Sequence, residues 1–211
     1  MKNFAKGLIV VALSLILVPL VPAVVSSFFD DEVAVNAPAQ LDKPQATEAY
    51  GLIESVSVYD TVSQTVKTYA IEDYLVQAVL GTLSANAEPE LVKAQAVLMY
   101  TYILGRRLEE TESPTPELNG CDISTDTNKY LPIVSREDFI ASNGDEALTL
   151  WENVSEEVNE VIGEYIAFDG YPIVPAYCFS CGGRTESALD VLGEDVEYLQ
   201  SVESEYDSDY I

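Results

Sequence analysis

The chain has 211 residues, with 36 Asp and Glu against 10 Lys and Arg, no His, and a formal net charge of −26. A chain this negative repels phosphate backbones, so we expect no nucleic-acid partner. The lack of His excludes imidazole-based catalytic triads and His-ligated zinc sites. With 48% hydrophobic residues the chain is too apolar for wholesale disorder, and its length suits one domain with a smaller appendage.

The first 29 residues have the pattern of a membrane anchor. Positions 7–25 are 19 uncharged, mostly apolar residues, which as a helix span roughly 28 Å. Lys2 and Lys6 precede this run and acids follow it, so the positive-inside rule places the rest of the chain outside the cytoplasm. We predict a single-pass protein of the cell membrane. The alternative is a secreted protein, because Val21-Pro22-Ala23 resembles a signal-peptide cleavage site.

Residues 49–211 are predicted to form the exported domain. They follow a linker over residues 30–48 that is rich in small residues, contains Pro and has no periodicity. At the start of the domain, alternating β-formers over residues 51–59 and 65–70 predict a hairpin.

Helical periodicity follows this hairpin. From Glu72 onward apolar residues recur every four positions, which predicts a helix with a broad buried face. Glu88-Pro89-Glu90 is typical of a helix start, and residues 91–108 form the body of a second, central helix. A third helix is predicted over residues 146–162.

Two stretches are rich in turn signals. Residues 111–132 hold four turn signals and Cys121, and we expect a surface excursion there. Asp169-Gly170, between residues 165–168 and 171–180, predicts a second hairpin. Strands, then helices, then strands predict an α+β domain, with small antiparallel sheet elements packed around two or three helices, after the N-terminal transmembrane helix.

Residues 180–187, with the sequence Ser-Cys-Gly-Gly-Arg-Thr-Glu-Ser, form the loop best suited to bind a sugar. Its glycines permit close backbone approach, and hydroxyl, guanidinium and carboxylate groups follow them. The candidate substrate-binding residues are Ser180, Gly182, Gly183, Arg184 and Glu186. The alternative is a plain turn in which Arg184 pairs with Glu186 or with another carboxylate.

The three cysteines allow several arrangements. Cys121, Cys178 and Cys181 can form a three-thiolate metal site, a disulfide plus a free thiol, or three separate thiols. Zinc normally takes four ligands, and this chain has no His to complete the set. We therefore expect no cofactor, with zinc as the alternative.

Six short segments occur in an order and spacing that is specific as a set. They are Val56-Ser57-Val58-Tyr59-Asp60, Glu72-Asp73-Tyr74-Leu75-Val76, Leu91-Val92-Lys93-Ala94-Gln95-Ala96-Val97, Thr101-Tyr102, residues 180–187 and Tyr198-Leu199-Gln200-Ser201-Val202. In this combination the chain resembles the stage II sporulation protein D family, which includes the amidase enhancer LytB. The resemblance implies an exported, usually membrane-anchored protein that acts on peptidoglycan glycan strands at the engulfing septum, beside an amidase that strips the stem peptides.

The resemblance also implies a reaction. Active members are lytic transglycosylases, in which one acid/base glutamate cleaves the glycan strand without water. That glutamate lies ten residues after the glutamate of the E-D-Y-L segment, and the corresponding residue here is Thr82. A threonine hydroxyl cannot donate a proton as a carboxylic acid does. The resemblance therefore implies a catalytically degenerate member, a pseudoenzyme that binds glycan or serves as a scaffold.

Two alternatives stay open. One is an active lytic transglycosylase in which Glu88 or Glu90 supplies the acid. The other is a shortened gene product without activity, since the chain ends soon after residues 198–202 whereas fuller members continue. Tyr100 and Cys178 are further departures, because the family usually has Arg and His at these positions.

Overall fold

The computed structural model describes residues 52–205 and residue 207. The predicted membrane segment over residues 1–29 and the linker over residues 30–48 lie outside these described residues. Within residues 52–205 and 207, no helix combines the length and the apolar character that a membrane span requires.

The described chain begins with the predicted hairpin, which is confirmed. Strand β1 (Ser55–Asp60) pairs antiparallel with β2 (Thr65–Ala70). The Asp60 carboxylate accepts hydrogen bonds from the backbone N–H groups of Val62 and Ser63 at 3.0 and 3.1 Å, which closes the turn. One face of β1 is buried, whereas β2 lies exposed at the edge of the sheet.

The first two predicted helices are also confirmed. Helix α2 (Ile71–Thr82) begins directly after β2, and α3 (Pro89–Glu112) begins at a proline, a residue that suits the first helical turn because no partner awaits its missing N–H. Helix α2 packs closely on the segment that precedes the next helix. A Cβ added at Gly81 would lie 2.5 Å from the carbonyl oxygen of Pro132, so glycine is required for this approach.

The prediction of a surface excursion over residues 111–132 is confirmed for residues 111–120, which are mostly exposed, but is wrong for residues 121–124. This stretch contains a short 3-10 helix, η1 (Pro116–Leu118), and strand β3 (Ile123–Ser124), and residues 121–124 are buried. Strand β3 pairs with β1 in parallel, so the sheet has the order β2-β1-β3 and is not purely antiparallel as predicted. A parallel pair needs a long crossover, which α2 and α3 provide.

An ion pair explains why this polar stretch is buried. Arg107 donates to the two carboxylate oxygens of Asp122 at 2.8 and 2.7 Å. The backbone N–H and the hydroxyl of Ser57 donate to the same carboxylate, each at 2.7 Å. Burial would raise the pKa of Asp122, but the bonds from Arg107 and Ser57 outweigh it and hold this pKa below its usual value. We call these three residues the clasp, because they join α3, β3 and β1.

Helix α4 (Arg136–Asn143) was not predicted from the sequence. It begins at Ser135, whose hydroxyl accepts a bond from the backbone N–H of Asp138 at 3.1 Å. A 3-10 turn, η2 (Gly144–Glu146), leads to α5 (Ala147–Glu160), which matches the third predicted helix. Helix α5 is amphipathic, and its buried residues are Ala147, Trp151, Val154 and Val158.

The second predicted hairpin is confirmed but is shorter than expected. Strands β4 (Ala167–Phe168) and β5 (Tyr171–Pro172) flank Asp169 and Gly170, which both have positive φ. The prediction of a strand continuing to Ser180 is wrong, because the chain leaves this two-stranded sheet after β5. We call residues 173–205 and 207 the arm; it contains α6 (Ala188–Leu192).

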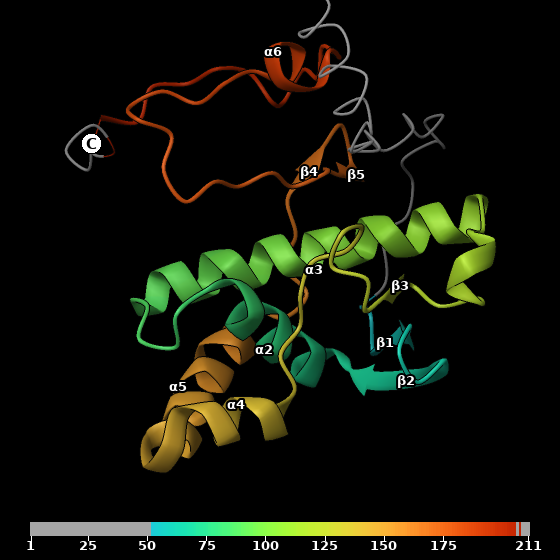
Figure 1. The fold of residues 1–211 in the computed structure, drawn as a ribbon. Helices are drawn as coiled ribbons and strands as arrows, with labels where there is room; N and C mark the ends of the chain where they lie inside the picture. The colour runs from blue at the N-terminus through green and yellow to red at the C-terminus, as the bar shows by residue number, and fades with distance from the viewer. Residues whose placement is uncertain (1–51, 206, 208–211) are drawn as a thin grey trace, which may run out of the picture.

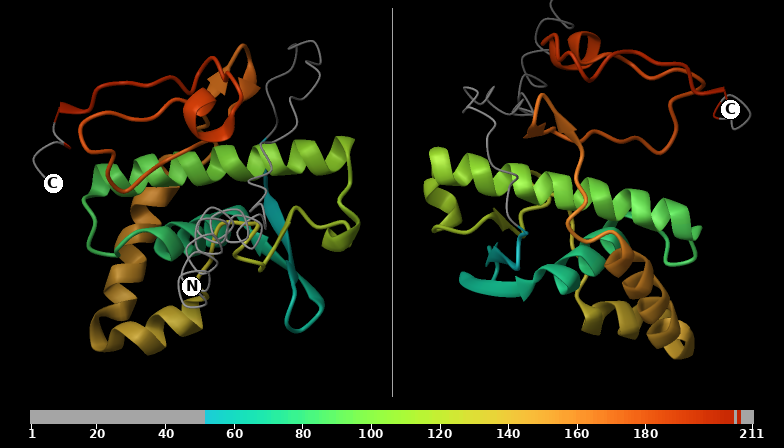
Figure 2. Two further views of the ribbon diagram at one scale, coloured as in Figure 1. Left: turned by 45° about the horizontal axis from the view of Figure 1, so that its top comes forward. Right: turned by 180° about the vertical axis from the view of Figure 1, so that it is seen from behind.

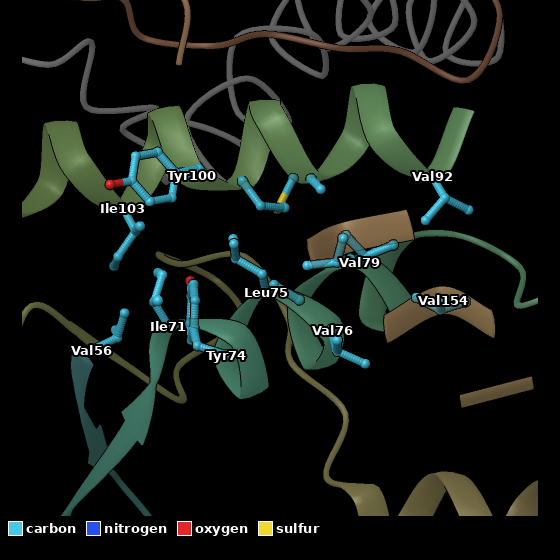
Figure 3. Close-up of a cluster of buried hydrophobic side chains, with 14 of the residues drawn as sticks. Val56, Ile71, Tyr74, Leu75, Val76, Val79, Val92, Tyr100, Ile103 and Val154 are labelled. Carbon is cyan, nitrogen blue, oxygen red and sulfur yellow. The ribbon is translucent and has the colours of Figure 1, made fainter. Parts of the chain in front are cut away.

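Helix α3 forms the middle layer of the molecule (Figure 1). Helices α2 and α5 lie on one side of it, and the arm lies on the other side in each view (Figures 1 and 2). Figure 3 shows Tyr100 and Ile103 of α3 facing Ile71 and Leu75 of α2, and all four are nearly inaccessible to solvent. The α+β class is therefore confirmed, with a core between the helices and the face of a small mixed sheet.

Candidate functional site

Thr82 is the last residue of α2, and its side chain is fully engaged in hydrogen bonds. The hydroxyl lies 3.1 Å from the carbonyl oxygens of both Ala78 and Val79, one turn back in the same helix. It also accepts a bond from Nε2 of Gln95 at 3.0 Å. Gln95 belongs to α3 and is 4% exposed. Thr82 therefore joins the end of α2 to α3, and no proton-donating acid stands at this position.

The two alternative acids lie at the start of α3. Glu88 precedes the helix, and its backbone carbonyl accepts bonds from Leu91 and Val92 while its side chain is exposed. The side chain of Glu90 is 87% exposed and pairs with Lys93 at 3.2 Å. Carboxylic acids that serve as general acids usually sit in apolar, water-poor pockets. Neither glutamate has such surroundings in this structure.

Lys93 joins α3 to α5 through further carboxylates. Its ammonium lies 3.2 Å from Glu157 and 2.7 Å from Glu160, and these bonds raise the pKa of Lys93. Beside this cluster a hollow of about 250 Å³ opens between the α2–α3 connection, the first turn of α3 and α5. Its polar lining residues are Asn86, Asn153, Glu156 and Glu157. The hollow is below the ~300–1,000 Å³ common for small-molecule sites, so it has the size for part of a sugar chain only.

The glycine loop over residues 180–187 lies in the arm. Its second half pairs with residues 199–204 through backbone bonds, among them Thr185 N–H to Val202 O at 2.9 Å. Arg184 forms an ion pair with Glu203 and donates to the Ser201 hydroxyl at 3.3 Å. The alternative in which Arg184 pairs with a carboxylate is therefore observed, and the partner is Glu203 instead of Glu186. Of the candidate residues, Ser180, Gly182, Arg184 and Glu186 are exposed and Gly183 is half-buried.

A residue that the sequence did not single out completes this loop. The backbone N–H of Cys181 donates to the Asp207 carboxylate. Hydrogen bonding from Cys181, with smaller contributions from Ser180 and Gly182, holds the pKa of Asp207 below its usual value. The sequence carries no signal for this contact, because Asp207 is one of 36 acids and lies in an acidic stretch.

The structure does not bring the loop and Thr82 together. Helix α3 lies between the arm and α2 (Figure 2), and no hydrogen bond or ion pair of the described residues joins loop 180–187 to α2 or to the α2–α3 connection. Thr82, Glu88 and Glu90 therefore lie next to the α2–α3 connection, whose residues 85–87 help to line the hollow, and the glycine loop lies in a separate region.

The three cysteines are separate thiols in this structure. Cys121 is buried beside the clasp, and burial raises the pKa of its thiol. Cys178 is exposed, and Cys181 is half-buried, with a pKa raised by its bond to Asp207. Among the described residues no group of three or more Cys, Asp and Glu side chains is arranged to hold a metal ion.

Comparison with known families assigns the class of protein. The family model described as "Stage II sporulation protein" matches residues 59–168, just over half of the 211-residue chain, and the chain belongs to this family, that of stage II sporulation protein D. The matched segment includes Thr82, Glu88 and Glu90 but ends before the glycine loop.

Individual relatives agree with this assignment. The chain is 26% identical to stage II sporulation protein D of Bacillus subtilis over 213 aligned positions, which cover 98% of this chain and 61% of that protein. The protein of the same name from Bacillus amyloliquefaciens is 26% identical over 72% of this chain and 44% of its own length. An uncharacterised protein of Brachyspira hyodysenteriae is 28% identical over 74% of this chain and 37% of its own length. The chain thus spans less than two thirds of these relatives.

Proposed function

We propose that this chain is a membrane-anchored, extracytoplasmic protein of the sporulation machinery that binds peptidoglycan glycan strands and does not cleave them. Membership of the stage II sporulation protein D family supports the sporulation setting. The N-terminal apolar run supports the anchor, with secretion after cleavage as the alternative. No cofactor is part of the proposal.

The hydroxyl of Thr82 is the main evidence for the proposed loss of catalysis. Lytic cleavage needs an acid that donates a proton to the leaving glycosidic oxygen. At the position that corresponds to the family's glutamate, this chain has a hydroxyl that is bonded to the carbonyls of Ala78 and Val79 and to Gln95. A neutral hydroxyl held in this way has no acidity near pH 7 to supply.

The glycine loop supports the binding half of the proposal. Ser180, Gly182, Arg184 and Glu186 present polar groups to solvent on a ribbon held by backbone bonds. A sugar is bound through such groups by hydrogen bonds to its hydroxyls and amide. We propose these residues, with Gly183, as the contacts to the glycan, and a cell-wall amidase of the engulfment machinery as the protein partner.

Product analysis tests the proposal. The full chain in detergent is incubated with amidase-stripped peptidoglycan, and anhydro ends are measured by mass spectrometry for the wild type, Thr82→Glu and Thr82→Gln. We expect none from the wild type or from the glutamine variant, which is close in size to Glu but has no acid. Restored cleavage in Thr82→Glu supports an intact cleft, whereas anhydro ends from the wild type would refute the loss of catalysis. Failure of the wild type to co-sediment with stripped glycan would refute binding.

The second candidate function is an active lytic transglycosylase. The hollow of about 250 Å³ favours it, because its lining includes Pro89, between the two candidate acids Glu88 and Glu90. In this case anhydro products from the wild type disappear in either Glu88→Gln or Glu90→Gln. An unchanged product trace in both variants would exclude both acids.

A further inference from the structure

The hollow beside the start of α3 has an apolar floor and a polar rim. In each view the α2–α3 connection lies at the same end of α3 as α5 (Figures 1 and 2), and both line the hollow. Val92 and Val154 are buried and form its floor with half-buried apolar neighbours, whereas Asn86, Asn153 and Glu156 are exposed at its rim. A ligand group that is apolar at one end and polar at the other fits such a lining.

The two asparagines of the rim have free side-chain amides. Asn86 comes from the α2–α3 connection and Asn153 from α5, so they belong to different walls of the hollow. Within the part of the chain that the structure describes, neither side-chain amide makes a hydrogen bond. Each amide offers two N–H donors and one carbonyl acceptor. The rim can therefore both donate to a bound group and accept from it.

Both walls are held in place without a ligand. In the α2–α3 connection, the backbone N–H of Ala87 donates to the carbonyl oxygen of Ser84 at 3.0 Å, and that of Asn86 donates to the Ser84 hydroxyl at 3.3 Å. On α5, four lining residues follow the spacing i, i+3, i+4 and i+7 from Leu150, which places them on one face of the helix. A pre-formed hollow binds a ligand at a lower cost in ordering.

The surroundings of the hollow carry an excess of negative charge. Glu156 and Glu157 line it, and Lys93 lies 3.2 Å from Glu157, 3.2 Å from Glu90 and 2.7 Å from Glu160. The single ammonium of this cluster is thus already shared among three carboxylates. An anionic ligand meets repulsion here, whereas a neutral ligand does not.

We propose that the hollow binds the acetamido group of an uncharged N-acetylated sugar, with the methyl group on the apolar floor and the amide between Asn86 and Asn153. The choice of a sugar rests on the proposed function. An acetamido group has one N–H donor, one carbonyl acceptor and one methyl group, which match the two free amides and the floor. N-acetylglucosamine is uncharged, whereas N-acetylmuramic acid carries a lactyl carboxylate. The hollow therefore selects the N-acetylglucosamine units of a peptidoglycan strand.

Two neutral trimers test the proposal, because they differ only at C2 of each ring. The full chain in detergent is titrated by calorimetry with the β-1,4-linked trimer of N-acetylglucosamine and with that of glucose, which has a hydroxyl in place of the acetamido group. A site that hydrogen-bonds a ligand group rejects the analogue that lacks it, so the acetylated trimer should bind at least about tenfold more tightly. Equal binding of the two trimers, or no binding of the acetylated one, would overturn the proposal.

Two variants locate the bound sugar. Asn86→Ala and Asn153→Ala each remove one amide from the rim and should weaken binding of the acetylated trimer by about threefold to tenfold. The matched control is Asn159→Ala, which removes an exposed amide of α5 outside the hollow and should bind as the wild type does. If binding is lost in Arg184→Ala and unchanged in both rim variants, the sugar lies on the glycine loop and the proposal is wrong.

Saturation-transfer NMR adds a readout of orientation, because it shows which ligand protons contact the protein. In the acetylated trimer the acetyl methyl protons should receive the most saturation, and Asn153→Ala should reduce this transfer. Empty micelles measure the background from detergent. Stronger transfer to the ring protons than to the methyl protons would contradict an acetamido group seated on the apolar floor.

The charge of the rim is tested with two monomers. N-acetylmuramic acid should bind several-fold more weakly than N-acetylglucosamine at low salt, and the difference should narrow at high salt, which screens the repulsion. Glu156→Gln removes one rim charge and should narrow the difference as well. Equal or tighter binding of N-acetylmuramic acid by the wild type would refute the selection of the uncharged sugar.

The two proposals fail separately. If the wild type co-sediments with stripped glycan but does not distinguish the two trimers, the acetamido site is wrong and the proposed function stands. If the acetylated trimer binds through Asn86 and Asn153 while stripped glycan is not bound, the site stands and the proposed function fails.

Discussion

The body of the molecule (residues 53–162) and the arm are stabilised by different contacts. The body buries a continuous set of apolar side chains between α2, α3, α5 and β1 (Figure 3), whereas only Ser187 and Ala188 of the described arm residues are buried. The arm is held by backbone pairing, by the Arg184–Glu203 ion pair and by contacts of Tyr198 with Phe168 and Val174. The body therefore determines the stability of the fold. The arm exposes polar groups on a segment that is held by backbone pairing and few side-chain contacts.

The largest expected effect is on the free energy of unfolding. Truncating a buried side chain in the body should lower it far more than truncating a side chain in the arm. Leu75 of α2 is 1% exposed and Leu189 of α6 is 54% exposed. Leu75→Ala should lower the free energy of unfolding by about 2–5 kcal/mol, because it leaves a cavity, and Leu189→Ala should change it by less than about 0.5 kcal/mol. The fluorescence of Trp151, the single tryptophan, measures both in urea. Equal shifts of the midpoint would contradict the division into body and arm.

The clasp is the polar counterpart of this core, and its effect depends on pH. In Asp122→Asn the new amide N–H group opposes the Ser57 N–H and one charge partner of Arg107 is lost, so stability should fall by about 2 kcal/mol at pH 7. The folded state lowers the pKa of Asp122, so its contribution is present above the unfolded value of about 3.9 and is lost as pH falls through the folded value.

The difference between wild type and Asp122→Asn should accordingly narrow below about pH 4, measured by urea unfolding across the pH range. Asp145→Asn, an exposed acid that precedes α5, is the control and should stay within about 0.5 kcal/mol of the wild type. A pH-independent difference would mean that the charge of Asp122 does not stabilise the fold.

Two helical glycines sharpen the description of the body, because they should respond in opposite directions. A Cβ at Gly81 would lie 2.5 Å from the backbone oxygen of Pro132, so Gly81→Ala should cost about 1–3 kcal/mol. At Gly105 of α3 no atom lies within 4 Å of the added Cβ, and Gly105→Ala should stabilise by up to about 1 kcal/mol. Thermal unfolding of the two variants measures both signs. Stabilisation by Gly81→Ala would show that α2 does not approach residue 132 so closely.

The sequence predicts the helices and turns whose formation depends on residues close together in the chain. The helical periods of α2, α3 and α5 were visible because each buries one continuous face, and Asp169-Gly170 identified its turn by its need for positive φ. Strand β3 has two residues in a turn-rich stretch, and its burial depends on the clasp, which joins residues 57, 107 and 122. Helix α4 buries Phe139 alone, so it has no apolar period to detect.

The candidate site shows the same limit. The sequence supplied the residues of the glycine loop and of the α2–α3 connection, but α3 separates the two in space (Figure 1). The Arg184–Glu203 pair and the contact of Asp207 with Cys181 join residues 19 and 26 positions apart. In a chain with 36 acids, nothing local distinguishes these two carboxylates from the others. Their partners follow from the way the arm folds back on itself.

The smallest effect on stability is expected when the Arg184–Glu203 ion pair of the arm is removed. This variant tests whether the arm is held by its backbone pairing or by the ion pair. Arg184 and Glu203 are 57% and 71% exposed, so solvent screens their attraction, and Glu203→Gln should cost less than about 0.5 kcal/mol. Amide hydrogen exchange of Thr185, whose N–H donates to Val202, should then rise by no more than about twofold, while amides of α3 stay unchanged. A much larger rise at Thr185 would mean that the ion pair, and not the backbone pairing, holds the loop in place. Released from Glu203, the Arg184 guanidinium would remain on an intact ribbon, so the same variant should keep or improve the affinity for stripped glycan.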